Sequence, residues 1–196
     1  MNRRERKKEE TRESIISCAV SFFKEKGFHE TSMEEIAEKS DVSKGTLYNY
    51  FQDKESILVG YFQGVIADYG KQIKEKFIES KDIKLTLYRL LDLISGIFKN
   101  DNELAAIYFK YRMHSRFDIN IDSSQRSGIE KWVLEVMEKA QQDGQLRNDI
   151  PAITLTRTFQ FLAMSFFISS IYKDEPFEVD VIKDQLVGLF LNGAKL

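Results

Sequence analysis

The chain has 196 residues, of which 42% are hydrophobic and 31% are charged, and its formal net charge is −2. This composition is typical of a folded globular protein and excludes a disordered chain. No run of eighteen apolar residues occurs, and the charged amino terminus lacks an apolar signal sequence. We therefore expect a cytoplasmic protein with no membrane partner.

Cysteine and histidine are too scarce for a metal centre. Cys18 is the only cysteine, which excludes an internal disulfide and a thiolate cluster. His114 and Asp118 have a spacing that could hold a metal, but His29, the only other histidine, lies far along the chain. The sequence therefore predicts no bound metal and no cofactor.

Apolar residues recur at spacings of three and four along almost the whole chain, which predicts an all-α protein. Gly, Asn, Asp and Pro residues mark the breaks between about nine helices. The predicted helices span about residues 11–26, 32–39, 44–51, 54–79, 83–98, 103–116, 124–143, 150–172 and 179–192. We predict a small amino-terminal unit of three helices at residues 1–56 and a larger helical bundle at residues 57–196.

Helix boundaries near the amino terminus carry recognisable caps. Gly27 follows the first helix as a left-handed stop. Thr31 and Glu34 have the spacing of a capping box at the start of the second helix. Ser43 and Asp53 are placed to cap the third and fourth helices.

The third predicted helix is too short and too polar to be a core element. At ~100° per residue, Leu47 and Phe51 share one side and Asn49 points away from it. Asparagine can pair with adenine in the major groove, and glycine lets a backbone approach the duplex closely. Lysine, threonine and tyrosine can reach phosphates. The residues expected at DNA are Lys44, Gly45, Thr46, Tyr48, Asn49, Tyr50 and Lys54.

Residues 15–58 resemble the DNA-binding domain of the TetR/AcrR family of bacterial regulators. The matching residues are Ala19, Phe23, Gly27, Phe28, Thr31, Ile36, Ala37, Val42, Ser43, Gly45, Thr46, Leu47, Tyr48, Tyr50, Phe51, Lys54, Glu55 and Leu58. Residues 144–147, followed by Asp149 and Pro151, are similar to the link between the seventh and eighth helices of that family. Asp41 stands where the family often has glycine, and aspartate tolerates the left-handed conformation of such a turn at small cost.

The resemblance implies a homodimer whose amino-terminal domains enter successive major grooves of an operator. It implies that the residues named above lie at DNA, with Thr31 at a phosphate. It also implies that residues 1–56 form a helix-turn-helix DNA-binding domain. Residues 57–196 would form the ligand-binding and dimerisation domain, with a ligand pocket in the bundle and dimerisation through the last two helices.

Two sets of bundle residues are candidates for these roles. The helix at 150–172 is apolar on more than one face, so one face can serve a partner subunit. The predicted dimer-interface residues are Phe161, Phe167, Ile182, Leu186 and Phe190. Aromatic and polar residues typical of ligand sites recur on the sixth to eighth helices. The predicted pocket residues are Tyr108, Tyr111, Arg112, Trp132 and Phe159.

These features predict a ligand-responsive, sequence-specific DNA-binding transcriptional regulator, a repressor released by a small-molecule effector. Its partners would be double-stranded operator DNA, the effector and a second copy of itself. An alternative is a helical small-molecule or lipid-binding protein without DNA-binding activity. An enzyme is disfavoured, because a helical metal oxidase needs Glu-x-x-His pairs and the chain has none.

Overall fold

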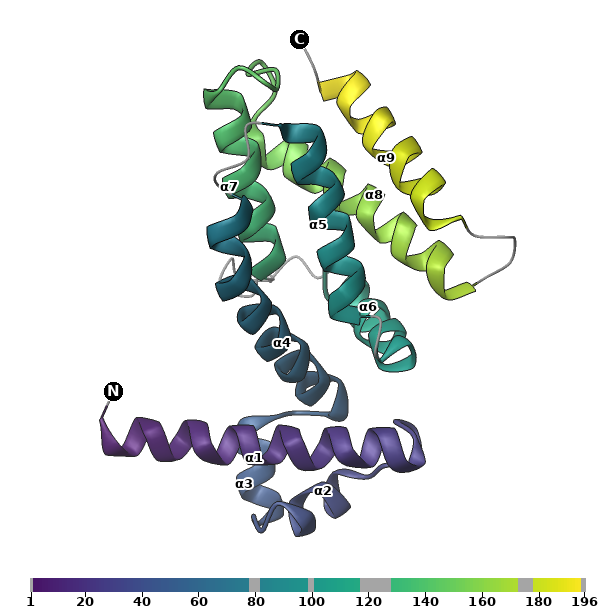
Figure 1. Cartoon of the computed structure of the whole chain (residues 1–196). Coiled ribbons are helices and arrows are strands. Elements are labelled where there is room, and N and C mark those ends of the chain that lie inside the picture. Colours follow the sequence, from purple (N-terminus) through teal and green to yellow (C-terminus); the bar gives the residue numbers. More distant parts are fainter. Residues whose placement is uncertain (1, 78–81, 99–100, 117–127, 173–177, 195–196) are drawn as a thin grey trace. The chain divides into compact units, whose positions relative to one another are not determined.

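The computed structural model describes residues 2–77, 82–98, 101–116, 128–172 and 178–194, and every regular element within them is an α-helix (Figure 1). The all-α prediction is confirmed. The helices are α1 (Arg3–Lys26), α2 (Met33–Lys39), α3 (Lys44–Tyr50), α4 (Lys54–Phe77), α5 (Ile83–Phe98), α6 (Asn102–Arg116), α7 (Gly128–Gln142), α8 (Ala152–Tyr172) and α9 (Val179–Ala194).

The largest difference from prediction is at the amino terminus. Helix α1 begins at Arg3, about two turns before the predicted start. Asn2 caps it through a capping box: its side-chain oxygen accepts the Glu5 amide at 2.9 Å, and the Glu5 carboxylate accepts the Asn2 amide at 2.9 Å. Gly27 ends the helix at φ 95°, ψ 152°, a region that essentially only glycine occupies.

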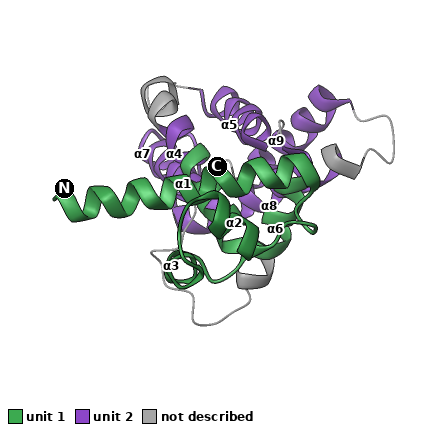
Figure 2. Ribbon diagram, turned by 90° about the horizontal axis from the view of Figure 1, so that it is seen from below, with its two compact units in different colours: residues 1–65, 103–121 green, residues 66–102, 122–196 purple. Residues whose placement is uncertain are grey.

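The chain divides into two compact units (Figure 2). Unit 1 contains Met1–Val65 and Glu103–Ile121, and unit 2 contains Ile66–Asn102 and Asp122–Leu196. Helix α6 therefore groups with the amino-terminal helices, and α4 contributes to both units. The functional boundary at residue 56 stays a prediction.

Unit 1 has a core of apolar side chains from α1, α2, α3, α4 and α6. Ile15, Ile36 and Leu47 are fully buried, and burying such a side chain stabilises the fold by about 1.5–3 kcal/mol. The rings of Phe62 on α4 and Tyr108 on α6 lie 4.8 Å apart between centroids, which explains why α6 belongs to this unit.

Aromatic pairs join α5, α8 and α9 within unit 2, and α7 packs on α8. Phe98 on α5 lies 5.2 Å from Phe167 on α8, and Phe159 on α8 lies 5.4 Å from Phe190 on α9, between ring centroids. Helix α8 therefore contributes one ring to each pair and links α5 to α9.

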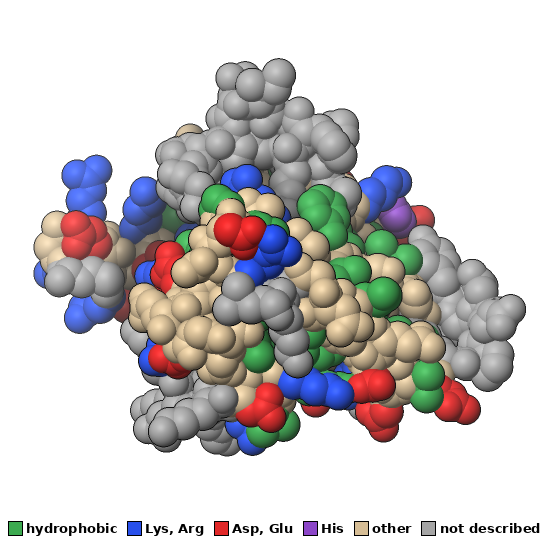
Figure 3. Space-filling view, turned by 90° about the horizontal axis from the view of Figure 1, so that it is seen from above, with side chains coloured by type: hydrophobic (Ala, Val, Ile, Leu, Met, Phe, Trp, Pro, Cys, Tyr) green, Lys and Arg blue, Asp and Glu red, His purple; other side chains and the backbone are tan. Residues whose placement is uncertain are grey.

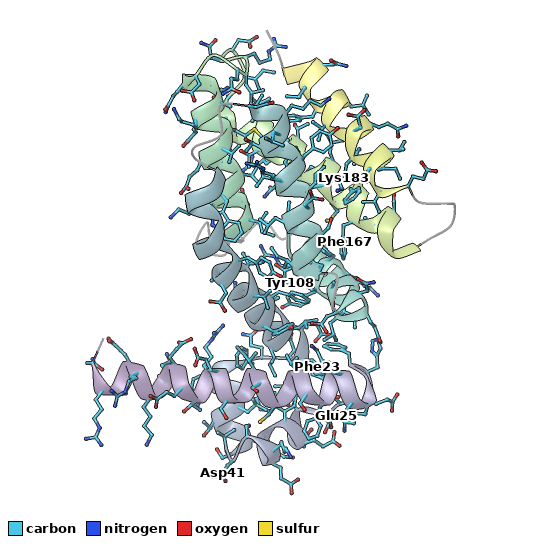
Figure 4. The ribbon with its side chains drawn as sticks, in the orientation of Figure 1. Phe23, Glu25, Asp41, Tyr108, Phe167 and Lys183 are labelled. Atoms are coloured by element: carbon cyan, nitrogen blue, oxygen red, sulfur yellow. The ribbon has the colours of Figure 1, made fainter. Side chains whose placement is uncertain are left out.

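A polar row also joins α5 to α9 within unit 2. The ammonium of Lys183, labelled in Figure 4, pairs with Asp92 and lies 3.3 Å from an Asp180 oxygen. The Tyr88 hydroxyl donates to Asp184, and this hydrogen bond raises the pKa of Tyr88 to about 12. The carboxylates of Asp92 and Asp180 compensate the charge of Lys183, whose side chain is largely buried.

Among the described residues, Ala152–Ser169 of α8 is the one stretch long and apolar enough to cross a membrane. This is weak evidence, because core helices of soluble proteins meet the same criteria. Phe159, Ala163, Phe166 and Phe167 in this stretch are buried in unit 2.

Candidate nucleic-acid interface

Helix α2 is capped one residue later than predicted. Ser32, not Thr31, is the N-cap, and its capping-box partner is Glu35 rather than Glu34. Thr31 is 2% exposed and its hydroxyl donates to the Gly27 carbonyl at 2.8 Å. The expected phosphate contact of Thr31 is therefore not supported, because its hydroxyl is buried and already paired.

Glu35 joins α2 to the end of α1. Its carboxylate accepts hydrogen bonds from the Lys26 ammonium and from the amide and hydroxyl of Ser32. The hydrogen bond from Lys26, followed by those from Ser32, lowers the pKa of Glu35 to about 2. This cluster fixes where α2 starts.

The turn between α2 and α3 has the predicted left-handed residue. Asp41 adopts φ 55°, the only positive φ outside glycine among the described residues, and Figure 4 labels it at this turn. The Val42 amide donates to the Ala37 carbonyl at 3.0 Å, which closes the turn. The turn thus forms with aspartate at a position where glycine would be unstrained.

Helix α3 has the predicted apolar and polar sides. Leu47 is fully buried and Phe51, its C-cap, is 5% exposed. Lys44, Gly45, Tyr48 and Asn49 are exposed, and we call these four residues the outward face of α3. The outward face takes no part in the apolar core of unit 1.

The remaining α3 residues have partial exposure. The Thr46 amide donates to the Ser43 Oγ at 3.1 Å, and the two hydroxyls lie 2.8 Å apart, which confirms Ser43 as the cap. Tyr50 is half-buried. These two residues flank the outward face, and their predicted DNA contacts stay predictions.

Lys44, the cation of the outward face, forms a solvent-exposed ion pair. The Lys44 ammonium lies 3.2 Å from a Glu34 carboxylate oxygen, and both side chains are more than half exposed. A hydrogen bond that the Glu34 carboxylate accepts from its own backbone amide, and then its interaction with Lys44, lower the pKa of Glu34. Such an exposed pair contributes little, so Lys44 can exchange Glu34 for a phosphate.

Lys54 does not have the free ammonium expected of a phosphate contact. Its Nζ donates to the carbonyl oxygens of Phe28 at 2.7 Å, His29 at 3.2 Å and Thr31 at 2.6 Å. It also lies 4.9 Å from the centroid of the Phe28 ring. An ammonium has three donors, so these carbonyls use its full capacity. These hydrogen bonds hold the start of α4 to the α1–α2 turn and favour a structural role for Lys54 over the predicted phosphate contact, which stays untested.

The predicted pocket residues fall in different compact units. Tyr108, Tyr111 and Arg112 belong to unit 1, and Trp132 and Phe159 belong to unit 2. Tyr108 and Phe159 are buried against neighbouring rings, and burial raises the pKa of Tyr111. A shared ligand site for these five residues stays a prediction.

Two of the predicted dimer-interface residues are core residues of the protomer. Phe167 and Phe190 are 3% and 4% exposed and pack inside unit 2, so they leave no surface for a partner. Phe161 is 58% exposed, and Ile182 and Leu186 are half-buried. The error arose because an apolar helical stripe does not reveal which side meets its own core.

The side chains of His114 and Asp118 lie outside the described residues. Within the part of the chain that is described, no three His, Cys, Asp or Glu side chains gather as metal ligands.

A short helix held by Leu47, preceded by a tight turn and carrying a polar outward face, defines a helix-turn-helix DNA-binding protein. Comparison with known proteins identifies the family of this DNA-binding protein. The family model for bacterial regulatory proteins of the tetR family matches residues 15–60. The chain belongs to this family of transcriptional regulators.

Individual relatives extend the similarity along the chain. The fatty acid metabolism regulator protein of Bacillus subtilis is 22% identical over 188 residues, covering 91% of this chain and 93% of its own. The Thermus thermophilus repressor FadR, solved with lauroyl-CoA, has a TM-score of 0.72 at 22% identity, covering 93% of this chain and 94% of its own. Bacillus subtilis FadR, solved with stearoyl-CoA, has a TM-score of 0.62 at 17% identity, covering 92% and 97% respectively.

Proposed function

We propose that the protein is a cytoplasmic, homodimeric transcriptional repressor that binds operator DNA through α3 and is released by a fatty acyl-CoA. The observation that supports DNA binding most directly is the outward face of α3. Gly45, Tyr48 and Asn49 are exposed while Leu47 on the opposite side is buried, as a recognition helix in a major groove requires.

The effector class is inferred from the relatives. Two proteins with this fold were solved with lauroyl-CoA and stearoyl-CoA. An acyl chain needs an apolar environment, and the buried side chains of unit 2 are mostly apolar.

The homodimer is supported by exposed apolar residues on the last two helices. Phe161 and Ile168 on α8, and Val181 and Leu189 on α9, are all exposed in the protomer. A four-helix interface between two copies would cover these side chains. In that arrangement Phe161 and Leu189 replace the buried Phe167 and Phe190 as interface residues.

Dimerisation can be tested with a charge on this surface. Phe161→Glu and Leu189→Glu should each give a monomer by light scattering and weaken operator binding. Leu85→Glu is the matched control, because Leu85 is an exposed apolar residue of α5 outside the proposed interface. A dimer in all variants would contradict the proposed interface.

The whole function is tested by selecting duplexes from a random pool with the full-length protein. The proposal predicts one enriched, two-fold symmetric sequence, since a dimer presents two recognition helices to half-sites about one helical turn apart. Lauroyl-CoA or stearoyl-CoA should then release that duplex, whereas free CoA and free laurate should not. Enrichment of no sequence would favour the alternative, a helical lipid-binding protein that does not bind DNA.

A further inference from the structure

The first two turns of α1 carry no core residue. Residues 3–10 are all exposed, and the nearest buried side chain of the helix is Ile15. Figure 3 shows blue and red side chains exposed together at this end of the helix, on the far left. At 1.5 Å per residue this segment extends the helix by about 12 Å.

Charge is segregated around this segment. At ~100° per residue, Arg3, Arg4, Lys7 and Lys8 occupy an arc of about 140° that contains no acidic residue of the segment. We call these four residues the basic face of α1. The other cations, Arg6 and Arg12, lie outside this arc and pair with Glu10 and Glu9, each at 3.4 Å.

The arrangement is unfavourable for the isolated helix. Arg3–Lys7 and Arg4–Lys8 are like charges four residues apart, and each such pair destabilises a helix by a few tenths of a kcal/mol. Cations in a first turn also oppose the helix dipole. A polyanion lying against the basic face would remove both penalties, whereas a purely structural role would not explain them.

The basic face lies on the side of α1 that faces the helix-turn-helix. Cys18, which falls on the same angular stripe as Lys7, directs its sulfur toward the Lys39 carbonyl at the end of α2, 3.7 Å away. In Figure 4, side chains ending in nitrogen project from the amino-terminal part of α1 toward the side where Asp41 is labelled. The basic face and α3 are thus on one side of unit 1.

We infer that the basic face of α1 binds the phosphate backbone of operator DNA beside the segment that α3 enters. The inference rests on the proposed function and adds a second, sequence-independent contact to it. Duplex DNA carries one negative charge per ~1.7 Å of axis when both strands are counted, so a 12 Å length of duplex carries about seven phosphates, shared between its two strands. This contact also accounts for DNA binding by a chain whose net charge is −2.

The test measures the salt dependence of binding to the duplex selected by the wild-type protein. The basic-face variant is Arg3→Gln, Arg4→Gln, Lys7→Gln and Lys8→Gln, since glutamine has a similar helix propensity. The matched control removes four exposed cations elsewhere: Arg89→Gln, Lys110→Gln, Lys131→Gln and Lys139→Gln. Circular dichroism checks that both variants keep their helices.

The slope of log K against log salt concentration should be shallower for the basic-face variant than for the wild-type protein by at least about 2. Each neutralised phosphate contributes ~0.9 to the slope, and each of the two protomers of the dimer would make one or more contacts. The control should keep the wild-type slope. Arg3→Lys with Arg4→Lys should also keep it, because charge is retained. Equal slopes for the basic-face variant and the control would overturn the inference and leave the proposed function intact. Failure of the wild-type protein to select any duplex would instead refute the proposed function.

Discussion

The indole ring of Trp132 on α7 lies against α4 at Gly70, both within unit 2. A Cβ atom on residue 70 would stand 2.0 Å from Cζ2 and 2.7 Å from Cε2 of the indole. Only a residue without a side chain permits this approach, so the pair fixes the distance between the two helices.

Gly70→Ala should therefore lower the free energy of unfolding by about 1–3 kcal/mol, because the ring must move out of a packed position. Gly64→Ala is the control on the same helix: a Cβ there meets nothing within 4 Å, and alanine favours a helix by up to ~1 kcal/mol. Urea unfolding measures both. Trp132 is the only tryptophan, so its emission should shift in Gly70→Ala alone. Equal stability of the two variants would show that the indole has room to relax.

Substitution of Lys54 should change the stability of the protein, whereas substitution of Lys44 should change its DNA binding. Lys54→Met leaves the carbonyls of Phe28 and Thr31 without their charged donor, which should cost about 1–3 kcal/mol of stability and leave the salt slope of DNA binding unchanged. Lys44→Met should leave stability unchanged and reduce the slope by ~0.9 for each phosphate that Lys44 neutralises in the wild-type complex. If Lys54→Met reduces the slope as Lys44→Met does, Lys54 contacts DNA after all.

Glu35 should make stability sensitive to acid. Its pKa is lowered from the ordinary value of 4.5 to about 2, so its contribution is present above about pH 4.5 and disappears as the pH falls toward 2. The difference in unfolding free energy between wild type and Glu35→Gln should be largest near neutral pH and shrink over that interval. In a Lys26→Met background the pH-dependent difference should be smaller, because Lys26 is the largest cause of the shift. A difference that is constant with pH would contradict the role of the Lys26–Glu35 pair.

The sequence was a good guide where local patterns decide structure. The spacing of Leu47 and Phe51 predicted which side of α3 is buried, and the range of α5 was predicted as Ile83–Phe98. The tolerance of aspartate for a left-handed φ predicted the turn at Asp41. The Asn2–Glu5 capping box is also a local signal, and it would have given the true start of α1.

Tertiary contacts determine the features that the sequence did not predict, namely the N-cap of α2 and the partners of Lys54. Thr31–Glu34 and Ser32–Glu35 are equivalent capping boxes in sequence, and the Lys26–Glu35 hydrogen bond, together with the buried hydroxyl of Thr31, selects the second. The carbonyl partners of Lys54 are more than twenty residues away in the chain, so no local pattern reveals them.

Asn49 should carry base specificity. It is exposed and supports no core contact, so Asn49→Ala should unfold as wild type does. Binding to the selected operator should weaken by about 1–3 kcal/mol, and discrimination should disappear at one base pair in each half-site. Competition with operators substituted at single positions locates that base pair. A uniform reduction of affinity on all sequences would assign Asn49 to the backbone instead.

Gly45→Ala tests most directly whether α3 presents its outward face to DNA. A Cβ at residue 45 would meet only the Ser43 Oγ, at 4.0 Å, so the free protein should be as stable as wild type or more stable, by up to ~1 kcal/mol. The added methyl should hold the α3 backbone away from the groove. Fluorescence anisotropy on the selected operator should then show affinity reduced at least about tenfold, or ~1.4 kcal/mol. Unchanged affinity in this folded variant would contradict the proposed role of α3.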